Sequence, residues 1–214
     1  MKQTMTVSTS QVKLWERLPH KQTVDAAIRA LNAHGFKAEL VPDRGAALER
    51  VRSLIPNGAD VMTGSSKTLD EIGLVSSLSS GDHPWNNLKA KIVSEKDREK
   101  QMTLRRMATF ADYFIGSVHA ITTDGQMVTG SASGSQLGAY AFGGKNLIIV
   151  AGTNKITGDL DEALLRLREH SVPLEDQRMK SLGFPGTYLS KIFIYEGEKQ
   201  RNVRVILVNE KLGF

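Results

Sequence analysis

The chain has 214 residues, of which 40% are hydrophobic, and this suits one globular domain with a substantial core. It contains no cysteine, which excludes disulfides, thiolate-bound iron–sulfur clusters and a cysteine nucleophile. The net charge is +5, but basic and acidic residues are interleaved and only 6% of residues are aromatic. A solvated surface explains this pattern better than a nucleic-acid patch, so no nucleic-acid partner is expected.

The distribution of apolar residues along the chain predicts its domain organisation and its cellular location. Residues 1–10 are polar, lack the apolar centre of a secretion signal, and are expected to form a flexible tail. Residues 11–214 are expected to form a single α/β domain, because neither a repeat nor a linker divides them. No run approaches the 18 or so apolar residues of a membrane span. We therefore expect a cytoplasmic protein with no membrane partner.

The N-terminal half alternates between helical and extended patterns. The apolar spacing predicts, in chain order, a helix from Thr23 to His34, a strand at 36–41, a helix through Leu48, Val51 and Ile55, a strand at 60–63, a helix through Leu69, Ile72 and Leu78, and a helix at 95–111. An irregular loop is expected at 79–87. Strand, helix, strand, loop and helix in this order are typical of a doubly wound α/β sheet.

The C-terminal half is richer in strands. It predicts a long strand at 113–122, a hairpin turn at Asp124-Gly125 leading into 126–129, a short helix at 136–142, a strand at 147–151, a helix from Leu160 to Leu167, and strands at 191–195 and 203–208. Five consecutive apolar residues at 147–151 suit a central strand that is covered on both faces. Asp159 and Glu162 have the spacing of a helix capping box.

The first candidate for chemistry is the segment that follows the strand at 60–63. Gly64 lets a ligand approach the backbone, and the hydroxyls of Ser65, Ser66 and Thr68 at the start of a helix favour an anion. The spacing is not that of an ATP-binding P-loop. Equally, Thr68 could be the N-cap and Glu71 its capping-box partner. Glu71 is also a candidate acid or base.

The second candidate is His119 at the end of an apolar run, five residues before Asp124. A carboxylate across a tight turn could orient this histidine as a general base. The alternative is that backbone groups satisfy His119 and that Asp124 is present because tight turns favour Asp-Gly.

The remaining candidates are small hydroxylated residues and cations. Ser133, Gly134, Ser135 and Gln136 offer hydrogen-bond donors with little bulk, which suits a carboxylate or a phosphate but also a close helix contact. After the strand at 147–151 come Asn154 and Lys155, with Lys155 expected to contact an anion rather than to act as a nucleophile. Arg178 is a further candidate cation. No set of spaced histidines and acids predicts a metal site, and no cofactor is expected.

Several segments together resemble one family, the LUD domain of lactate-utilisation protein C. They are Gly64-Ser65-Ser66-Lys67-Thr68-Leu69, Gly116-Ser117-Val118-His119-Ala120, Thr123-Asp124-Gly125, Ser133-Gly134-Ser135-Gln136-Leu137, Asn154-Lys155-Ile156, Pro173-Leu174-Glu175-Asp176 with Arg178, and 205–214. The resemblance implies a Rossmann-like, mainly parallel sheet with helices on both faces, as in the NagB/RpiA/CoA-transferase-like fold. It also implies a role in lactate-type organic-acid utilisation, with a small anionic metabolite as ligand: a hydroxy acid, a phosphorylated metabolite or a CoA ester.

The chain departs from the better-known members of this family at two places. Residues 131–136 read Ser-Ala-Ser-Gly-Ser-Gln, where the lactate-utilisation branch has an Asp-Gly-x-Gly-Asn-Arg pattern, so that branch's substrate does not transfer directly. The cysteine cluster of many members is absent. These losses keep a second hypothesis open, in which the protein is a non-catalytic accessory subunit that binds an iron–sulfur oxidoreductase partner. A homodimer is compatible with either hypothesis.

Overall fold

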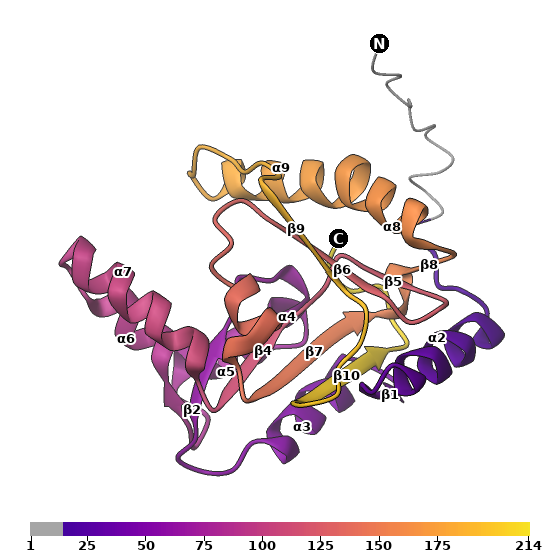
Figure 1. Ribbon diagram of the computed structural model, residues 1–214. Coiled ribbons are helices and arrows are strands. Elements are labelled where there is room, and N and C mark those ends of the chain that lie inside the picture. Colours follow the sequence, from indigo (N-terminus) through magenta and orange to yellow (C-terminus); the bar gives the residue numbers. More distant parts are fainter. Residues whose placement is uncertain (1–14) are drawn as a thin grey trace.

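The computed structural model describes residues 15–214 and contains two β-sheets with helices on either side (Figure 1). The expected flexible tail at residues 1–10 lies outside the described residues. No helix in the range 15–214 combines the length and the apolar character needed to cross a membrane.

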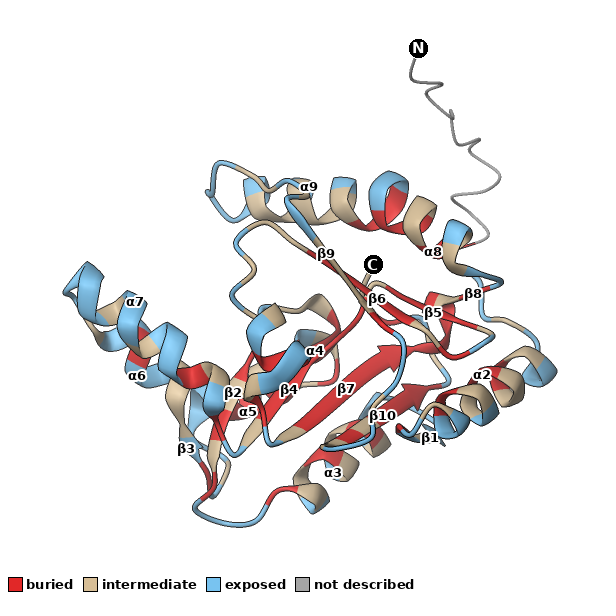
Figure 2. Ribbon diagram, viewed as in Figure 1, coloured by how far each residue is buried: buried red, intermediate tan, exposed pale blue. Residues whose placement is uncertain are grey.

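The larger sheet has six strands, and all of its neighbouring pairs are parallel. Its spatial order is β1 (Lys37–Val41), β10 (Asn202–Val208), β7 (Asn146–Gly152), β4 (Tyr113–Gly116), β2 (Asp60–Thr63) and β3 (Asn86–Asn87). The strands β7 and β10 each have a neighbour on both sides and are buried along most of their length (Figure 2). This confirms the prediction that 147–151 is a central strand, because a parallel sheet covered on both faces selects continuous apolar runs.

Alternating residues of these strands enter two separate cores. Ile148 of β7 and Ile206 of β10 face α3 (Arg44–Leu54), α4 (Lys67–Glu71) and α5 (Leu74–Ser80). The other face carries, in one cross-strand row, Phe114, Leu147 and Val203. It is covered by α2 (Lys21–Ala33), the π-helical turn η2 (Ala139–Gly143) and the smaller sheet. The expected Rossmann-like α/β fold with helices on both faces is therefore present.

The smaller sheet has four strands in the order β8 (Ile156–Thr157), β5 (Ala120–Thr122), β6 (Met127–Ser131) and β9 (Lys191–Tyr195). The hairpin between β5 and β6 turns at Asp124 and Gly125, as predicted. One face of this sheet joins the core over the larger sheet. The other is covered by α8 (Leu160–Arg166), η4 (Leu167–Ser171) and α9 (Val172–Ser181), which run across the top of Figure 1.

Four sequence predictions need correction. The expected strand at 113–122 is two strands, β4 and β5, which belong to different sheets. The helix expected through Leu69 and Leu78 breaks at Gly73, whose φ of +83° only glycine adopts readily. The loop at 79–87 is shorter than expected because α5 extends to Ser80. The helix expected at 95–111 is α7 (Arg98–Met107) followed by the 3₁₀ turn η1 (Ala108–Phe110).

Two helices were not predicted. One is α6 (Leu88–Ser94), which projects with α7 from one end of the larger sheet (Figure 1). The other is α9, where Pro173 occupies the first turn of the helix, a position that needs no backbone N–H. Helix α7 has no buried residue (Figure 2). Its sequence is therefore too polar to predict where the helix packs on the rest of the protein.

Candidate functional site

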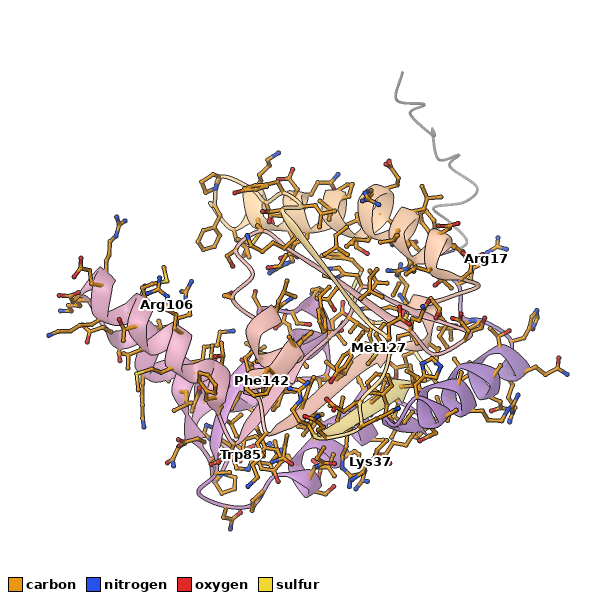
Figure 3. The ribbon with its side chains drawn as sticks, viewed as in Figure 1. Arg17, Lys37, Trp85, Arg106, Met127 and Phe142 are labelled. Carbon is orange, nitrogen blue, oxygen red and sulfur yellow. The ribbon has the colours of Figure 1, made fainter. Side chains whose placement is uncertain are left out.

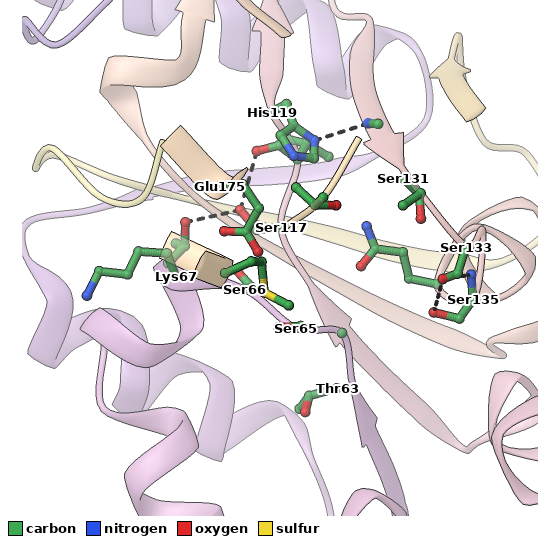
Figure 4. Close-up of a pocket in the computed structure, with 18 of the residues that line it drawn as sticks. Thr63, Ser65, Ser66, Lys67, Ser117, His119, Ser131, Ser133, Ser135 and Glu175 are labelled. Carbon is green, nitrogen blue, oxygen red and sulfur yellow. Dashed lines mark hydrogen bonds between the residues drawn. The ribbon is translucent and has the colours of Figure 1, made fainter. Parts of the chain in front are cut away.

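A cavity of about 510 Å³ opens at the carboxyl ends of three neighbouring strands, β2, β4 and β7. This edge of a parallel sheet is where α/β folds usually bind ligands. Side chains from both sheets and from α6, α7 and α9 complete the wall. Figure 4 labels several of the lining residues, among them Ser117, His119 and Glu175 of α9. Its polar lining comprises Thr63, Ser65, Ser66, Lys67, Thr68, Lys89, Arg105, Ser117, His119, Ser131, Ser133, Ser135, Gln136, Lys155, Glu175 and Thr187.

The most deeply buried charged side chain of the described lining is Lys155, which is 3% exposed. It follows β7, while Thr68 follows β2 and Ser117 follows β4. The Lys155 Nζ lies 2.9 Å from Thr68 Oγ1, 3.1 Å from Ser117 Oγ and 3.0 Å from the carbonyl oxygen of Val118. Three consecutive strand ends thus bring one amine and two hydroxyls into direct contact.

Burial changes the acidity of this amine. Removal from water, together with the nearby positive charge of Arg166, lowers the pKa of Lys155 to about 7, while the charge of Glu71 partly opposes the shift. No carboxylate forms an ion pair with the Lys155 amine within the described part of the chain. The neutral and charged forms of Lys155 are therefore both accessible near pH 7.

The C-terminal segment packs closely against the group formed by Lys155, Thr68 and Ser117. Asn154 Oδ1 accepts a hydrogen bond of 3.1 Å from the Leu212 amide, and Glu71 Oε2 accepts one of 2.6 Å from the Gly213 amide. A side chain at Gly213 would begin 3.0 Å from Lys155 Nζ, and one at Gly152 would begin 2.6 Å from the Leu212 amide nitrogen. Glu71 and Asn154 thus fix the backbone that closes the bottom of the cavity.

Ser66, and not Thr68, is the N-cap of α4: its hydroxyl accepts from the Leu69 amide at 3.4 Å. The expected capping box of Thr68 with Glu71 is therefore wrong. Thr68 is 1% exposed and its hydroxyl is directed at Lys155, which explains why it is unavailable for capping.

His119 forms part of the wall at the junction of the two sheets, half-buried. Its Nδ1 accepts a hydrogen bond of 3.1 Å from the Gly130 amide, which leaves the ring proton on Nε2. Burial, together with the charges of Lys155 and Arg166, lowers the pKa of His119 to about 3. A neutral ring with so low a pKa is a better hydrogen-bond donor than a proton acceptor at neutral pH.

Asp124 is not brought to His119. Its carboxylate accepts a hydrogen bond from the hydroxyl of Thr122 across the hairpin turn, away from the cavity lining. The turn role that Asp-Gly sequences commonly have is sufficient to explain this residue.

A second wall of the cavity consists of side chains on helices. Lys89 comes from α6 and Arg105 from α7, and neither forms an ion pair within the part of the chain that the structure describes. Burial and the neighbouring charge of Arg105 lower the pKa of Lys89. Glu175 of α9 is the one carboxylate side chain of the described lining, and it is bound by Arg178 at 2.7 and 2.6 Å.

A hydroxyl-rich loop forms the third wall. The Gly134 amide donates to Ser131 Oγ at 2.9 Å, and Ser133 Oγ lies 3.1 Å from Ser135 Oγ. Gln136 approaches Gly64 so closely that a side chain at Gly64 would begin 2.8 Å from its Oε1. Opposite, Thr63 Oγ1 is buried at the end of β2 without a hydrogen-bond partner among the described residues.

The structure brings most of the predicted site residues to one cavity. Those that line it are Gly64, Ser65, Ser66, Thr68, His119, Ser133, Ser135, Gln136 and Lys155. Those outside the lining are Glu71, Asp124, Gly134, Asn154 and Arg178. Within residues 15–214, no three His, Cys, Asp or Glu side chains are grouped so as to hold a metal ion.

Sequence reasoning missed several polar side chains of this cavity, among them Ser117, Thr63, Lys89 and Arg105. Ser117 directly follows β4, and this position at a strand end is a signal from which it could have been predicted. Thr63, the last residue of β2, had a similar signal. Lys89 and Arg105 come from helices α6 and α7, whose sequences gave no local pattern to indicate that they reach the cavity.

Comparison with known proteins decides the family, because the LUD domain matches residues 24–208. The chain belongs to the LUD-domain family. A crystal structure of a DUF162 family protein from Deinococcus radiodurans is similar in fold, with a TM-score of 0.54 and 11% identity. The similarity covers 90% of this chain and 100% of that one, and at this identity it concerns the fold alone. No curated protein matches the LUD-domain chain.

Proposed function

We propose that this LUD-domain protein binds a small anionic metabolite in the cavity at the ends of β2, β4 and β7. One observation carries the proposal. Among the described side chains of the lining, Lys67, Lys89, Arg105 and Lys155 are basic, whereas Glu175 alone is acidic. Arg178 already binds that acid, at 2.6 Å between Nη2 and Oε1.

The physical argument rests on how charge behaves in a concave site. A cleft lined by one sign of charge concentrates the opposite ion, because the protein walls screen less than water does. Lys67 is partly balanced by Asp70 and Glu71 at 3.6 and 3.7 Å. Lys89 and Arg105 have no such balance among the described residues, so a carboxylate or phosphate would supply it.

Hydroxyl groups elsewhere in the lining would complete the recognition of such a ligand. Thr63 Oγ1 is without a partner among the described residues, and the hydroxyls of Ser133 and Ser135 face the same space (Figure 4). A cavity of about 510 Å³ has the size of a site for a small metabolite. Family membership supports organic acids of lactate-type metabolism as the first ligands to test: hydroxy acids, phosphorylated metabolites and CoA esters.

The test is a thermal-shift screen with lactate, pyruvate, glycolate, sugar phosphates, acetyl-CoA and inorganic phosphate. A ligand at a hundredfold excess over its dissociation constant should stabilise the native state by about 2.7 kcal/mol. The shift should shrink in Ser66→Ala and His119→Ala, which alter two walls of the cavity. The matched control is Ser79→Ala, an exposed serine of α5 outside the lining. A flat response to every ligand would refute anion binding.

A second candidate function is that of an accessory subunit for an iron–sulfur oxidoreductase. It is favoured by exposed apolar side chains on the helical end of the molecule: Val93 is 72% exposed, Phe110 69% and Phe142 76%. Figure 3 labels Phe142 on η2 and Arg106 on the projecting α7. Scattered apolar residues are common on surfaces, but several on one end are typical of a contact surface.

Light scattering after size-exclusion chromatography tests this second function and also a homodimer. The protein would be run alone and mixed with an iron–sulfur oxidoreductase of lactate metabolism. A complex that disappears in the double variant Phe110→Ser, Phe142→Ser supports the contact surface. A monomer under both conditions would remove this candidate.

A further inference from the structure

The group formed by Lys155, Ser117 and Thr68 has the geometry of a nucleophile with its base. The Ser117 hydroxyl lies 3.1 Å from the Lys155 amine, within direct proton-transfer distance. All three residues line the cavity, although Thr68 and Lys155 are only 1% and 3% exposed and Ser117 is 9% exposed. Ser117 is therefore the member of the group that a ligand reaches most easily.

The hydrogen bonds around Lys155 decide which of these atoms can attack a substrate. A lysine amine has three positions besides its carbon, and here all three are occupied, by Thr68 Oγ1, Ser117 Oγ and the Val118 carbonyl oxygen. No position is left for a bond to a substrate carbon, so a Schiff base on Lys155 would require this packing to break. A neutral amine has two N–H donors and one lone pair. The Val118 carbonyl oxygen can only accept a hydrogen bond from the amine, whereas the hydroxyl of Ser117 or Thr68 can also donate one to the lone pair of the amine.

We infer that Ser117 is a nucleophile and Lys155 its general base, and that the site cleaves an activated acyl bond, an ester or thioester, on an anionic molecule. This inference rests on the proposed function, because the basic lining would hold the anionic part of the substrate. Nucleophilic serines with a lysine base are a known variant of the Ser-His-Asp arrangement. Thr68 is a positioning residue, since its hydroxyl holds the amine at 2.9 Å.

The reaction balances with water as the second substrate. The proton of the Ser117 hydroxyl passes to Lys155 Nζ as the Oγ–carbon bond forms. The bond between that carbon and the leaving oxygen or sulfur then breaks, and the leaving group takes the proton from Lys155. Water next attacks the acyl-serine and gives a proton to Lys155, and Ser117 recovers its proton when the Oγ–carbon bond breaks.

Electrostatics near the group are consistent with this sequence of steps. Burial and the charge of Arg166 lower the pKa of Lys155 to about 7, so an appreciable fraction of the amine is neutral at physiological pH. After it accepts the proton, Lys155 is a cation next to the reacting carbon. A buried cation at this place would stabilise the negative oxygen that develops during acyl transfer.

Labelling with a small alkyl fluorophosphonate tests the inference, because this reagent forms a stable phosphorus–oxygen bond with activated serines and releases fluoride. Peptide mapping by mass spectrometry of the wild-type protein should place the adduct on Ser117. The rate of labelling at Ser117 should rise with pH around 7 and should fall at least tenfold in Lys155→Met. The control Ser79→Ala, an exposed serine of α5 outside the lining, should label at the wild-type rate. Hydrolysis of 4-nitrophenyl acetate and of its thioester analogue would then separate the two bond types.

The outcomes distinguish this inference from anion binding. If the folded wild-type protein shows an anion-induced thermal shift but no adduct on Ser117, the nucleophile is refuted and the proposed function stands. If Ser117 is labelled and no anion stabilises the protein, the nucleophile stands and its anionic substrate class falls. An adduct only on another serine, such as Ser133, would also overturn the assignment. The wild-type result does not depend on any variant folding.

Discussion

Two of the three walls of the cavity differ in character, one built from strand ends and one built from helices. On the strand wall, Lys155, Thr68 and Ser117 are buried and hydrogen-bonded to one another at 2.9 to 3.3 Å. On the helix wall, Lys89 is half-buried and Arg105 exposed, and neither forms an ion pair within the described residues. The first wall fixes a geometry, whereas the second supplies charge.

This difference indicates what each wall contributes. Side chains that are packed and fully hydrogen-bonded lose little freedom when a ligand arrives, which suits a step that depends on distance. Side chains that remain solvated attract an ion over a longer range and tolerate variation in its shape. We therefore expect substitutions on the strand wall to change stability and chemistry, and substitutions on the helix wall to change affinity alone.

The largest expected effect is on the strand wall, from Gly152→Ala. Its new methyl group would begin 2.6 Å from both the Glu210 carbonyl oxygen and the Leu212 amide nitrogen, which are backbone atoms with little room to move. Overpacking of this kind costs about 1–3 kcal/mol, and more when backbone must shift. Urea unfolding would measure the loss. In the control Gly138→Ala the methyl group has its nearest neighbour at 3.7 Å, so a similar loss there would contradict this account.

The next effect concerns pH. The pKa of Lys155 in the folded protein is about 7, below that of a lysine in water, so the unfolded chain binds more protons than the folded one between pH 7 and about 10. The free energy of unfolding should therefore rise with pH across this interval, by at most about 1.4 kcal/mol per unit from this group. Lys155→Met should flatten the rise in urea titrations at pH 7, 8 and 9. Equal slopes in variant and wild type would mean that the buried amine is not the cause; the exposed-site substitution Lys145→Met is the control.

On the helix wall, Arg105→Ala should weaken the binding of inorganic phosphate about fivefold, equivalent to roughly 1 kcal/mol, with the melting temperature unchanged. Arg106 provides a matched control, because it is the next residue of α7 and lies outside the lining. Isothermal titration at low and at physiological salt would measure both variants. An equal loss of phosphate affinity in the two variants would mean that the helix wall acts only through diffuse surface charge.

The smallest expected effect is a gain. Glu175→Gln removes the one carboxylate side chain of the described lining and frees Arg178, which now binds it at 2.6 Å. Phosphate affinity should rise about twofold, a change typical of a partly solvated charge. Glu169→Gln, an exposed acid of η4, should leave the affinity as it is. Weaker binding in Glu175→Gln would place Glu175 among the groups that contact the ligand.

The strand wall was largely predictable from the sequence and the helix wall was not. Apolar runs such as 147–151 locate buried strands, and the residues directly after them are close in space because parallel strands end at one edge. Gly64, Ser66, Thr68 and Lys155 were found in this way. The same rule would have selected Ser117 if 113–122 had been divided into two strands.

Features that depend on long-range packing left no local pattern. The smaller sheet pairs β6 with β9, whose residues lie some sixty positions apart, and neither strand alone indicates this partner. Lys89 and Arg105 belong to helices whose surfaces are mostly solvated, so only the packing of α6 and α7 places them at the cavity. The buried state of Lys155 likewise follows from the segment that ends in Leu212 and Gly213.

The central claim is that the cavity at the strand ends binds a small anion, and amide chemical-shift mapping by NMR tests it most directly. Inorganic phosphate and lactate would each be titrated into the isotopically labelled protein at low salt. We expect a saturable shift of the amides at 64–68 and 131–136, with α2 and β1 on the far edge of the sheet unaffected. Shifts confined to other surfaces, or none at millimolar ligand, would contradict the claim.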